Sequence, residues 1–209
     1  MEFTMRKPLS HQQEEALSRM REVLQDDLLS LRVSGVRFEE HFDRDECSIA
    51  CSVREEPAGQ SISVEATGVG LIDAFFSGLC TRYADAHPSL GTLRFTGFQV
   101  TGLMGDSSNG SGSDAKADAT ITVTNSYGHT FEFGAITPSV AQSSMESVLA
   151  AVEYFVNSEK AYIQMVRALE HYRAEGRTDL VAKYTDLLTN MVRNTSYSDV
   201  IEQLRRSTL

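Results

Sequence analysis

With 209 residues, the chain is long enough for one sizeable domain or for a smaller core with helical extensions. Its 41% hydrophobic and 23% charged residues are ordinary for a folded protein. The formal net charge of −10 argues against a nucleic-acid-binding surface and against attraction to anionic membranes, because both require clustered lysine and arginine.

The cysteine content and the N-terminal residues favour a reducing, cytoplasmic environment. Cys47, Cys51 and Cys80 form no CxxC pair, and this low density suits a reducing environment. Too few ligands surround them for zinc, so we interpret them as ordinary thiols. The N-terminus has no apolar signal core, and no apolar stretch approaches the roughly 18 residues of a membrane span. We therefore expect a cytoplasmic protein without a metal, a cofactor or a membrane segment.

A helix is predicted within residues 1–34. Ser10 and Gln13 fit a capping box, in which each side chain meets the other residue's backbone amide. An apolar seam follows and ends before Gly35: Leu17, Met20, Leu24, Leu28 and Leu31. Such a seam predicts packing against the same domain or against a partner helix.

Three strands and a helix are predicted in a first unit, residues 35–90. Alternating apolar and polar residues indicate strands at 36–41, 48–54 and 61–67. The helix after them carries one apolar stripe and ends near Pro88. The stripe consists of Ile72, Phe75, Phe76, Leu79, Cys80 and Tyr83. Sheet and helix are therefore expected to share one core.

Gly68 and Gly70 lie at the corner between the third strand and this helix. Glycine permits close approach of backbone or ligand, and the amides that begin a helix lack intrahelical acceptors. They could receive an anion such as a carboxylate. On spacing alone the turn itself explains both glycines, since position 73 is Asp and the Gly-x-Gly-x-x-Gly dinucleotide fingerprint is incomplete.

A second unit, residues 91–159, repeats this order. Strands are predicted at 93–100, 115–124 and 129–136, with a low-complexity polar loop at 105–114. Thr137 then serves as a helix N-cap with proline after it. Aligning the corners places Thr137 opposite Gly68 and Ser143 opposite Ala74, a repeat of pattern rather than of letters.

Residues 160–209 are predicted to be a helical extension. One apolar stripe starts at Tyr162 and ends before Gly176, Thr178 caps a second helix, and Ser198 caps a short third. The whole chain is thus predicted to be α+β: flanking terminal helices, and a central domain, residues 35–159, with helices on one face of antiparallel sheets.

Three segments of the two units carry motifs. Residues 64–74 read VEATGVGLIDA, residues 112–121 read GSDAKADATI, and residues 134–143 read GAITPSVAQS. In this order and spacing they resemble the C-terminal allosteric, or dimerisation, domain of α-isopropylmalate synthase and its relative citramalate synthase. The counterparts there are a Gly-x-Gly-x-x-Asp-Ala corner, a Gly-Thr-Asp-Ala lead into a strand, and a Gly-x-x-Thr-Asp-Ile-x-x-Ala-Ser helix start. The resemblance covers residues 36–158.

The resemblance implies a regulatory amino-acid-binding module of leucine biosynthesis. In that family the domain binds leucine or isoleucine near the helix starts at a homodimer interface, and so inhibits a separate catalytic barrel. The implied effector-binding residues are Gly68, Gly70, Asp73, Ala74, Thr137 and Ser143. The amides at the helix starts could bind the α-carboxylate of the effector, and Asp73 could pair with its ammonium group. Ile72 or Val140 could line a pocket for its apolar side chain.

No catalytic role is expected for this chain alone. A catalytic barrel needs about 250 residues by itself. The five histidines never form the family's His-x-His metal pair, and no nucleophile or phosphate-loop motif is present. An enzyme of another type is the least supported hypothesis, because no polar residues converge with a nucleophile. A separate catalytic subunit would supply the acyltransferase chemistry.

The alternative hypothesis is a dimeric interaction scaffold that kept the fold and lost effector binding. Pro138 stands where the family has an acidic residue, and Ala141 where it has a glutamate. The terminal helices would then hold another protein. Asp73 also has a purely structural interpretation, because an acid in the first turn of a helix is favoured by the helix dipole.

Overall fold

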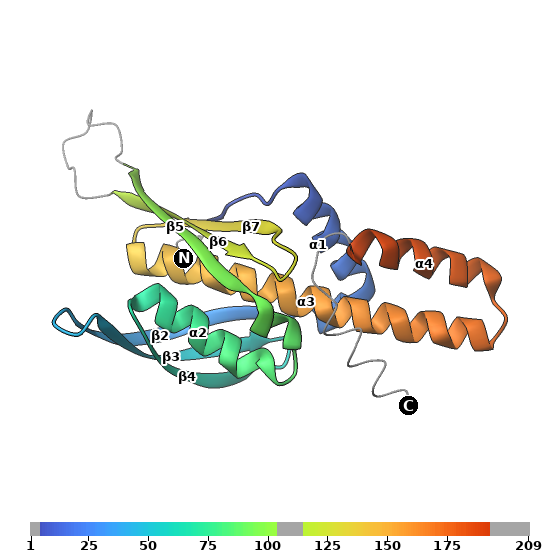
Figure 1. Cartoon of the computed structure of the whole chain (residues 1–209), viewed down its shortest axis with the longest axis horizontal. Helices are drawn as coiled ribbons and strands as arrows, with labels where there is room; N and C mark the ends of the chain where they lie inside the picture. Colours follow the sequence, from blue (N-terminus) through green and yellow to red (C-terminus); the bar gives the residue numbers. More distant parts are fainter. Residues whose placement is uncertain (1–4, 104–114, 193–209) are drawn as a thin grey trace.

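The computed structural model describes residues 5–103 and 115–192 (Figure 1). The predicted polar loop at 105–114, the start of the 112–121 motif and the short helix expected after Ser198 lie outside the described residues. The elements in chain order are β1 (Met5–Arg6), α1 (His11–Leu24), η1 (Gln25–Asp27), β2 (Ser30–His41), β3 (Glu46–Glu56), β4 (Gln60–Gly68), α2 (Leu71–Ala84), η2 (Pro88–Thr92), β5 (Arg94–Leu103), β6 (Lys116–Thr124), β7 (Thr130–Thr137), α3 (Val140–Ala174) and α4 (Thr178–Val192).

The α+β fold with two βββα units is confirmed. One antiparallel sheet has the order β2-β3-β4 and the other the order β1-β7-β6-β5. Helix α2 packs on β3 and β4, α3 packs on β6 and β7, and the two helices touch each other. Figure 1 shows both helices between the two sheets. One continuous hydrophobic core therefore joins the units.

Each unit also reaches across to the helix of the other unit. The edge strand β5 contributes Phe95, whose ring centroid lies 5.8 Å from that of Phe76 on α2. The edge strand β2 donates the Leu31 amide to Glu153 on α3 at 2.7 Å. These exchanged contacts make the units interdependent, so we expect them to unfold together.

The two edge strands repeat in letters as well as in pattern. Both strands are interrupted by a register shift, between Val33 and Gly35 in β2 and between Phe95 and Gly97 in β5. Aligning the shifts places LRVSGVRF at 31–38 opposite LRFTGFQV at 93–100. The identical residues are Leu31 and Leu93, Arg32 and Arg94, and Gly35 and Gly97, so the repeat predicted from pattern includes a few shared letters here.

The N-terminal helix is shorter than its apolar seam suggested. The Ser10 and Gln13 capping box is present, but α1 ends at Leu24, where Gln25 adopts a positive φ of 49°. Two acidic residues follow at the negative end of the helix dipole, where they disfavour continuation. Leu31 is fully buried but belongs to β2, which begins six residues before the predicted strand.

Helix α3 crosses the predicted boundary between residues 159 and 160. It runs unbroken for 35 residues, so the stripes expected in two separate helices belong to one. Asn157 and Glu159 interrupt the apolar pattern, yet both are buried and bonded to other elements. Asn157 accepts the Leu29 amide at 2.7 Å, and Glu159 accepts the Ser89 amide at 3.0 Å. Helix α4 then packs back along α3.

The three cysteine thiols are expected to resist modification in the folded protein. Cys47 and Cys51 are buried on the inner face of β3, and Cys80 is half-buried on α2. Burial raises the pKa of Cys51 to about 11 and that of Cys80 to about 12, so little reactive thiolate is present near neutral pH. Labelling with a disulfide reagent should be slow until urea is added. Native labelling at the rate of a free thiol would contradict this.

Candidate functional site

The first predicted corner is held by close packing of its own backbone. A Cβ on Gly68 would lie 2.5 Å from Asp73 Oδ2 and 2.6 Å from the Ala74 nitrogen, so glycine is required. Asp73 Oδ2 accepts the Val69 amide at 3.1 Å, and Ala74 is fully buried. The Asp73 side chain therefore folds back over the corner and has a structural role there.

The start of α2 nevertheless remains open to a ligand. Its N-cap residue is Gly70, and no side chain accepts a hydrogen bond from the first amides. A Cβ at Gly70 would meet no atom within 4 Å. Because the first-turn amides have no intrahelical acceptor, this corner has the geometry of a backbone anion site.

The second corner is closed by its own side chains. Ser143 Oγ accepts the Thr137 amide at 2.9 Å and donates to the Ala117 carbonyl at 2.8 Å. Thr137 Oγ1 lies 2.8 Å from Ser143 Oγ and accepts the Ser139 amide at 3.1 Å. Thr137 is 3% exposed and Ser143 is 0% exposed. These two hydroxyls fasten β7 to α3 and do not face a ligand.

Replacing Ser143 with alanine is expected to lower the free energy of unfolding by about 1–3 kcal/mol, because the buried Thr137 amide loses its acceptor. Urea unfolding measures this. Ser144→Ala is the matched control, since Ser144 donates only to the Val140 carbonyl of its own helix and leaves no buried amide unpaired. Equal losses in the two variants would contradict the role assigned to Ser143.

Both corners lie at one end of the molecule. Figure 1 shows α2 and α3 starting at the same end, and their N-caps Gly70 and Ser139 are equivalent in the repeat. Exposed apolar residues of both units lie on strand ends and helix starts there. We call these residues the apolar end: Phe38, Phe42, Val69, Val100, Leu103 and Val140. Such a surface is typical of a binding or association site.

A cleft of about 430 Å³, not predicted from the sequence, lies elsewhere. It is formed by the segment before α1, by α1 itself, by the turn before β2, by β7 and by α3. None of the six predicted site residues lines it. The sequence signal that was missed is a pair of polar residues, Glu153 and Asn157, within the apolar stripe of α3.

The charges along this cleft are mostly paired. Arg6 contacts Glu153 at 2.5 and 3.0 Å and Glu146 at 3.4 Å. Burial alone would lower the pKa of Arg6. The hydrogen bonds and negative charges of Glu153 and Glu146 have the larger combined effect, so the pKa of Arg6 is raised. Burial also raises the pKa of Glu146. Lys7 pairs with Asp118 at 2.5 Å.

Fold and site define an α+β protein of two interlocked βββα units with one open and one closed helix start. A scan against protein-family models finds no match, and a search of curated proteins finds no similar sequence. Within residues 5–103 and 115–192, no helix is long and apolar enough to cross a membrane. The same residues contain no group of three or more His, Cys, Asp or Glu side chains placed to hold a metal ion.

Proposed function

We propose that this chain is a regulatory module that binds a branched-chain amino acid and acts as a cytoplasmic homodimer without catalysis of its own. The observation that carries the proposal is the uncapped start of α2, which follows directly after the exposed Val69 at the apolar end. The resemblance to the feedback domain of α-isopropylmalate synthase supplies the class of effector.

The open corner suits both polar groups of an amino acid. Its α-carboxylate would accept hydrogen bonds from the Leu71 and Ile72 amides, where the helix dipole also favours a negative charge. Its ammonium would pair with the half-buried Asp73 carboxylate. Thr137 and Ser143 support the equivalent corner from inside and do not contact the effector in this proposal.

The apolar end would serve the effector and the dimer together. The side chain of a leucine or isoleucine would pack on Val69, while a second copy would cover the rest of the apolar end. Sedimentation analysis should therefore show a dimer, and a charge introduced by Phe42→Glu, at a side chain 87% exposed in the single chain, should weaken it. A monomer at all accessible concentrations would contradict the homodimer.

Thermal unfolding with added amino acids tests effector binding. Leucine, isoleucine or valine at millimolar concentration should raise the melting temperature saturably, because a ligand at 100 times its Kd stabilises by about 2.7 kcal/mol. Gly70→Asp has room for its side chain and should cap α2, keeping the apo protein stable while abolishing the ligand response. Ser139→Asp, at the equivalent N-cap of α3, should retain the response. A flat wild-type response would count against the proposal.

The second candidate is the dimeric interaction scaffold without effector binding. The hydroxyls of Thr137 and Ser143 are fully used within the chain, and Pro138 and Ala141 replace the family's acidic residues. A dimer that none of these amino acids or their keto acids stabilises would favour this candidate. A saturable response that Gly70→Asp removes would exclude it.

A further inference from the structure

We propose that the cleft between the N-terminal segment, α1 and α3 is a second small-molecule site, which binds an aliphatic monocarboxylate. This site involves neither helix start and does not depend on the function proposed above. Its walls come from segments distant in sequence, including Arg6 to Leu9 before α1 and Glu153 to Asn157 on α3.

The size and lining of the cleft suit a small apolar molecule. Its 430 Å³ equals the liquid volume of roughly fourteen water molecules at about 30 Å³ each, which lies within the usual range of ligand sites. Apolar side chains from several elements contribute to the wall: Leu9, Leu17, Leu28, Leu29, Phe133 and Ala150. An aliphatic chain would bury its surface against them without leaving polar groups unpaired.

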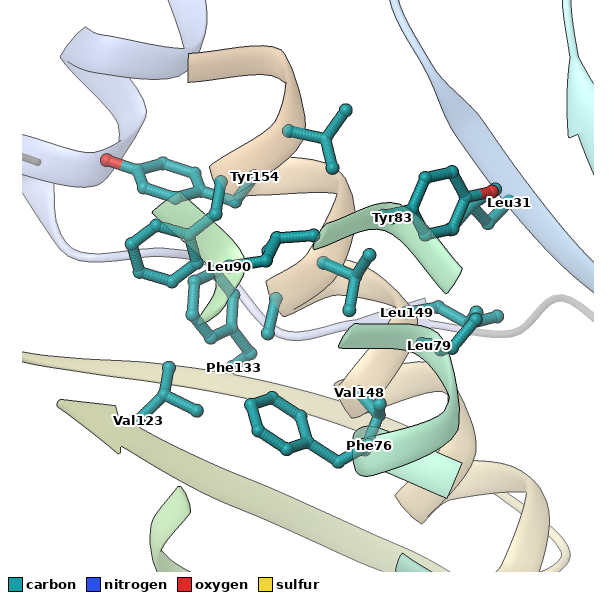
Figure 2. Close-up of a cluster of buried hydrophobic side chains, with 14 of the residues drawn as sticks. Leu31, Phe76, Leu79, Tyr83, Leu90, Val123, Phe133, Val148, Leu149 and Tyr154 are labelled. Carbon is teal, nitrogen blue, oxygen red and sulfur yellow. The ribbon is translucent and has the colours of Figure 1, made fainter. Parts of the chain in front are cut away.

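Tyr154 supplies a hydrogen-bonding group that the chain itself does not use. The residue is 3% exposed, and its buried hydroxyl has no hydrogen-bond partner among the described residues. Its ring is fixed at 5.5 Å from Phe133 and 5.4 Å from Phe155, measured between ring centroids. In Figure 2 the hydroxyl points away from the Phe133 ring, toward the blue ribbon of the N-terminal region. Because buried hydroxyls normally find a partner, this one indicates an acceptor supplied by a ligand.

The two polar residues that flank Tyr154 on α3 are already occupied. Glu153 accepts from Arg6 and from the Leu31 amide. Asn157 exchanges two hydrogen bonds with the Leu29 backbone, at 2.7 and 2.8 Å. Burial raises the pKa of Tyr154, so its hydroxyl stays neutral and can donate a proton to an acceptor oxygen. Tyr154 is therefore the buried donor left for a ligand.

The cation available to a carboxylate in this cleft is Arg21. The lining contains Arg6, Lys7 and Arg21 together with Glu14 and Glu153, and Arg6 and Lys7 also pair with Glu146 and Asp118. Arg6 and Lys7 are paired with carboxylates, whereas Arg21 forms no ion pair within the described part of the chain. A monocarboxylate would balance Arg21, and the Glu14 carboxylate would repel a second negative charge.

Calorimetric titration of the full chain with octanoate tests the site. Saturable binding is expected, and Tyr154→Phe should weaken it about tenfold while the apo melting temperature stays the same or rises, because no partner is orphaned. Arg21→Gln should weaken octanoate binding several-fold and leave 1-octanol binding unchanged. The matched controls are Arg19→Gln on the same helix and Tyr127→Phe on the exposed β6–β7 turn, and neither should alter binding.

Two further measurements separate this cleft from other apolar surfaces. Ala150→Met, which fills the cleft, should abolish octanoate binding, and Gly70→Asp at the other site should leave it unchanged. Adipate, which carries a carboxylate at each end, should bind more weakly than octanoate. The proposal is overturned if millimolar octanoate does not bind, or if Tyr154→Phe and Ala150→Met both bind it as wild type does.

Discussion

Replacing Glu153 with alanine is expected to lower the free energy of unfolding by about 3 kcal/mol. Glu153 is 9% exposed, and its carboxylate accepts from Arg6 and from the Leu31 amide at 2.7 Å. Its removal leaves a partly buried guanidinium and a buried backbone amide without their main acceptor. Because these bonds fasten β1 and β2 to α3, the loss affects both sheets.

Urea unfolding of matched variants measures the effect of Glu153. Glu153→Gln keeps an oxygen for the Leu31 amide, so it should lose clearly less stability than Glu153→Ala. Glu146→Ala removes a weaker contact to the same Arg6, at 3.4 Å, and should cost no more than about 1 kcal/mol. If Glu153→Ala were no worse than Glu146→Ala, the carboxylate would not fasten the sheets to α3.

Phe133→Ala should cost about 3–5 kcal/mol, the usual loss for removing a fully buried aromatic ring. Phe133 is 1% exposed, and its ring lies 5.5 Å from that of Tyr154 and 6.2 Å from that of Phe155. Figure 2 shows it among buried side chains of both units. The cavity left by its removal therefore opens in the shared core.

The control for Phe133 is Phe42→Ala, because Phe42 is 87% exposed on the β2–β3 turn. Its stability change should stay within about 0.5 kcal/mol when measured on the monomer. A single cooperative transition is expected for both variants, since the core is continuous across the units. Loss of one unit while the other stays folded would contradict that continuity.

Strand faces and the start of α1 could be predicted because their signals are local. The N-cap predicted at Thr137 was wrong, since Thr137 ends β7 and Ser139 caps α3. Alternation placed Ala117, Ala119, Ile121 and Val123 on one strand face, and all four are buried. The capping box at Ser10 involves residues only three positions apart, so the sequence contains the whole interaction.

Helix length and strand ends depended on contacts between distant residues. Helix α3 continues through Asn157 and Glu159 because backbone amides of other elements donate to these side chains. The Leu31 amide likewise donates to Glu153, and β2 therefore begins closer to α1 than the alternation alone predicted. Polar residues within the apolar stripe of α3 bind the neighbouring elements.

In the candidate sites, too, local pairs could be predicted from the sequence, whereas contacts between distant residues could not. Thr137 and Ser143 were identified as a pair from the repeat, and the structure brings them together. That their hydroxyls point inward depends on the Ala117 carbonyl of a neighbouring strand, which no local spacing reveals. The cleft beside Tyr154 joins Arg6 and Glu153, which are 147 residues apart, and therefore left no motif in the sequence.

Titration of the ¹⁵N-labelled protein with leucine, followed by amide resonances, tests most directly whether α2 starts an effector site. Saturable shifts are expected, with the largest at the Leu71 and Ile72 amides, because these groups would donate to the α-carboxylate. Isoleucine should act on the same amides. Absence of binding by both amino acids, or binding that leaves the Leu71 and Ile72 amides unmoved, would contradict the proposal.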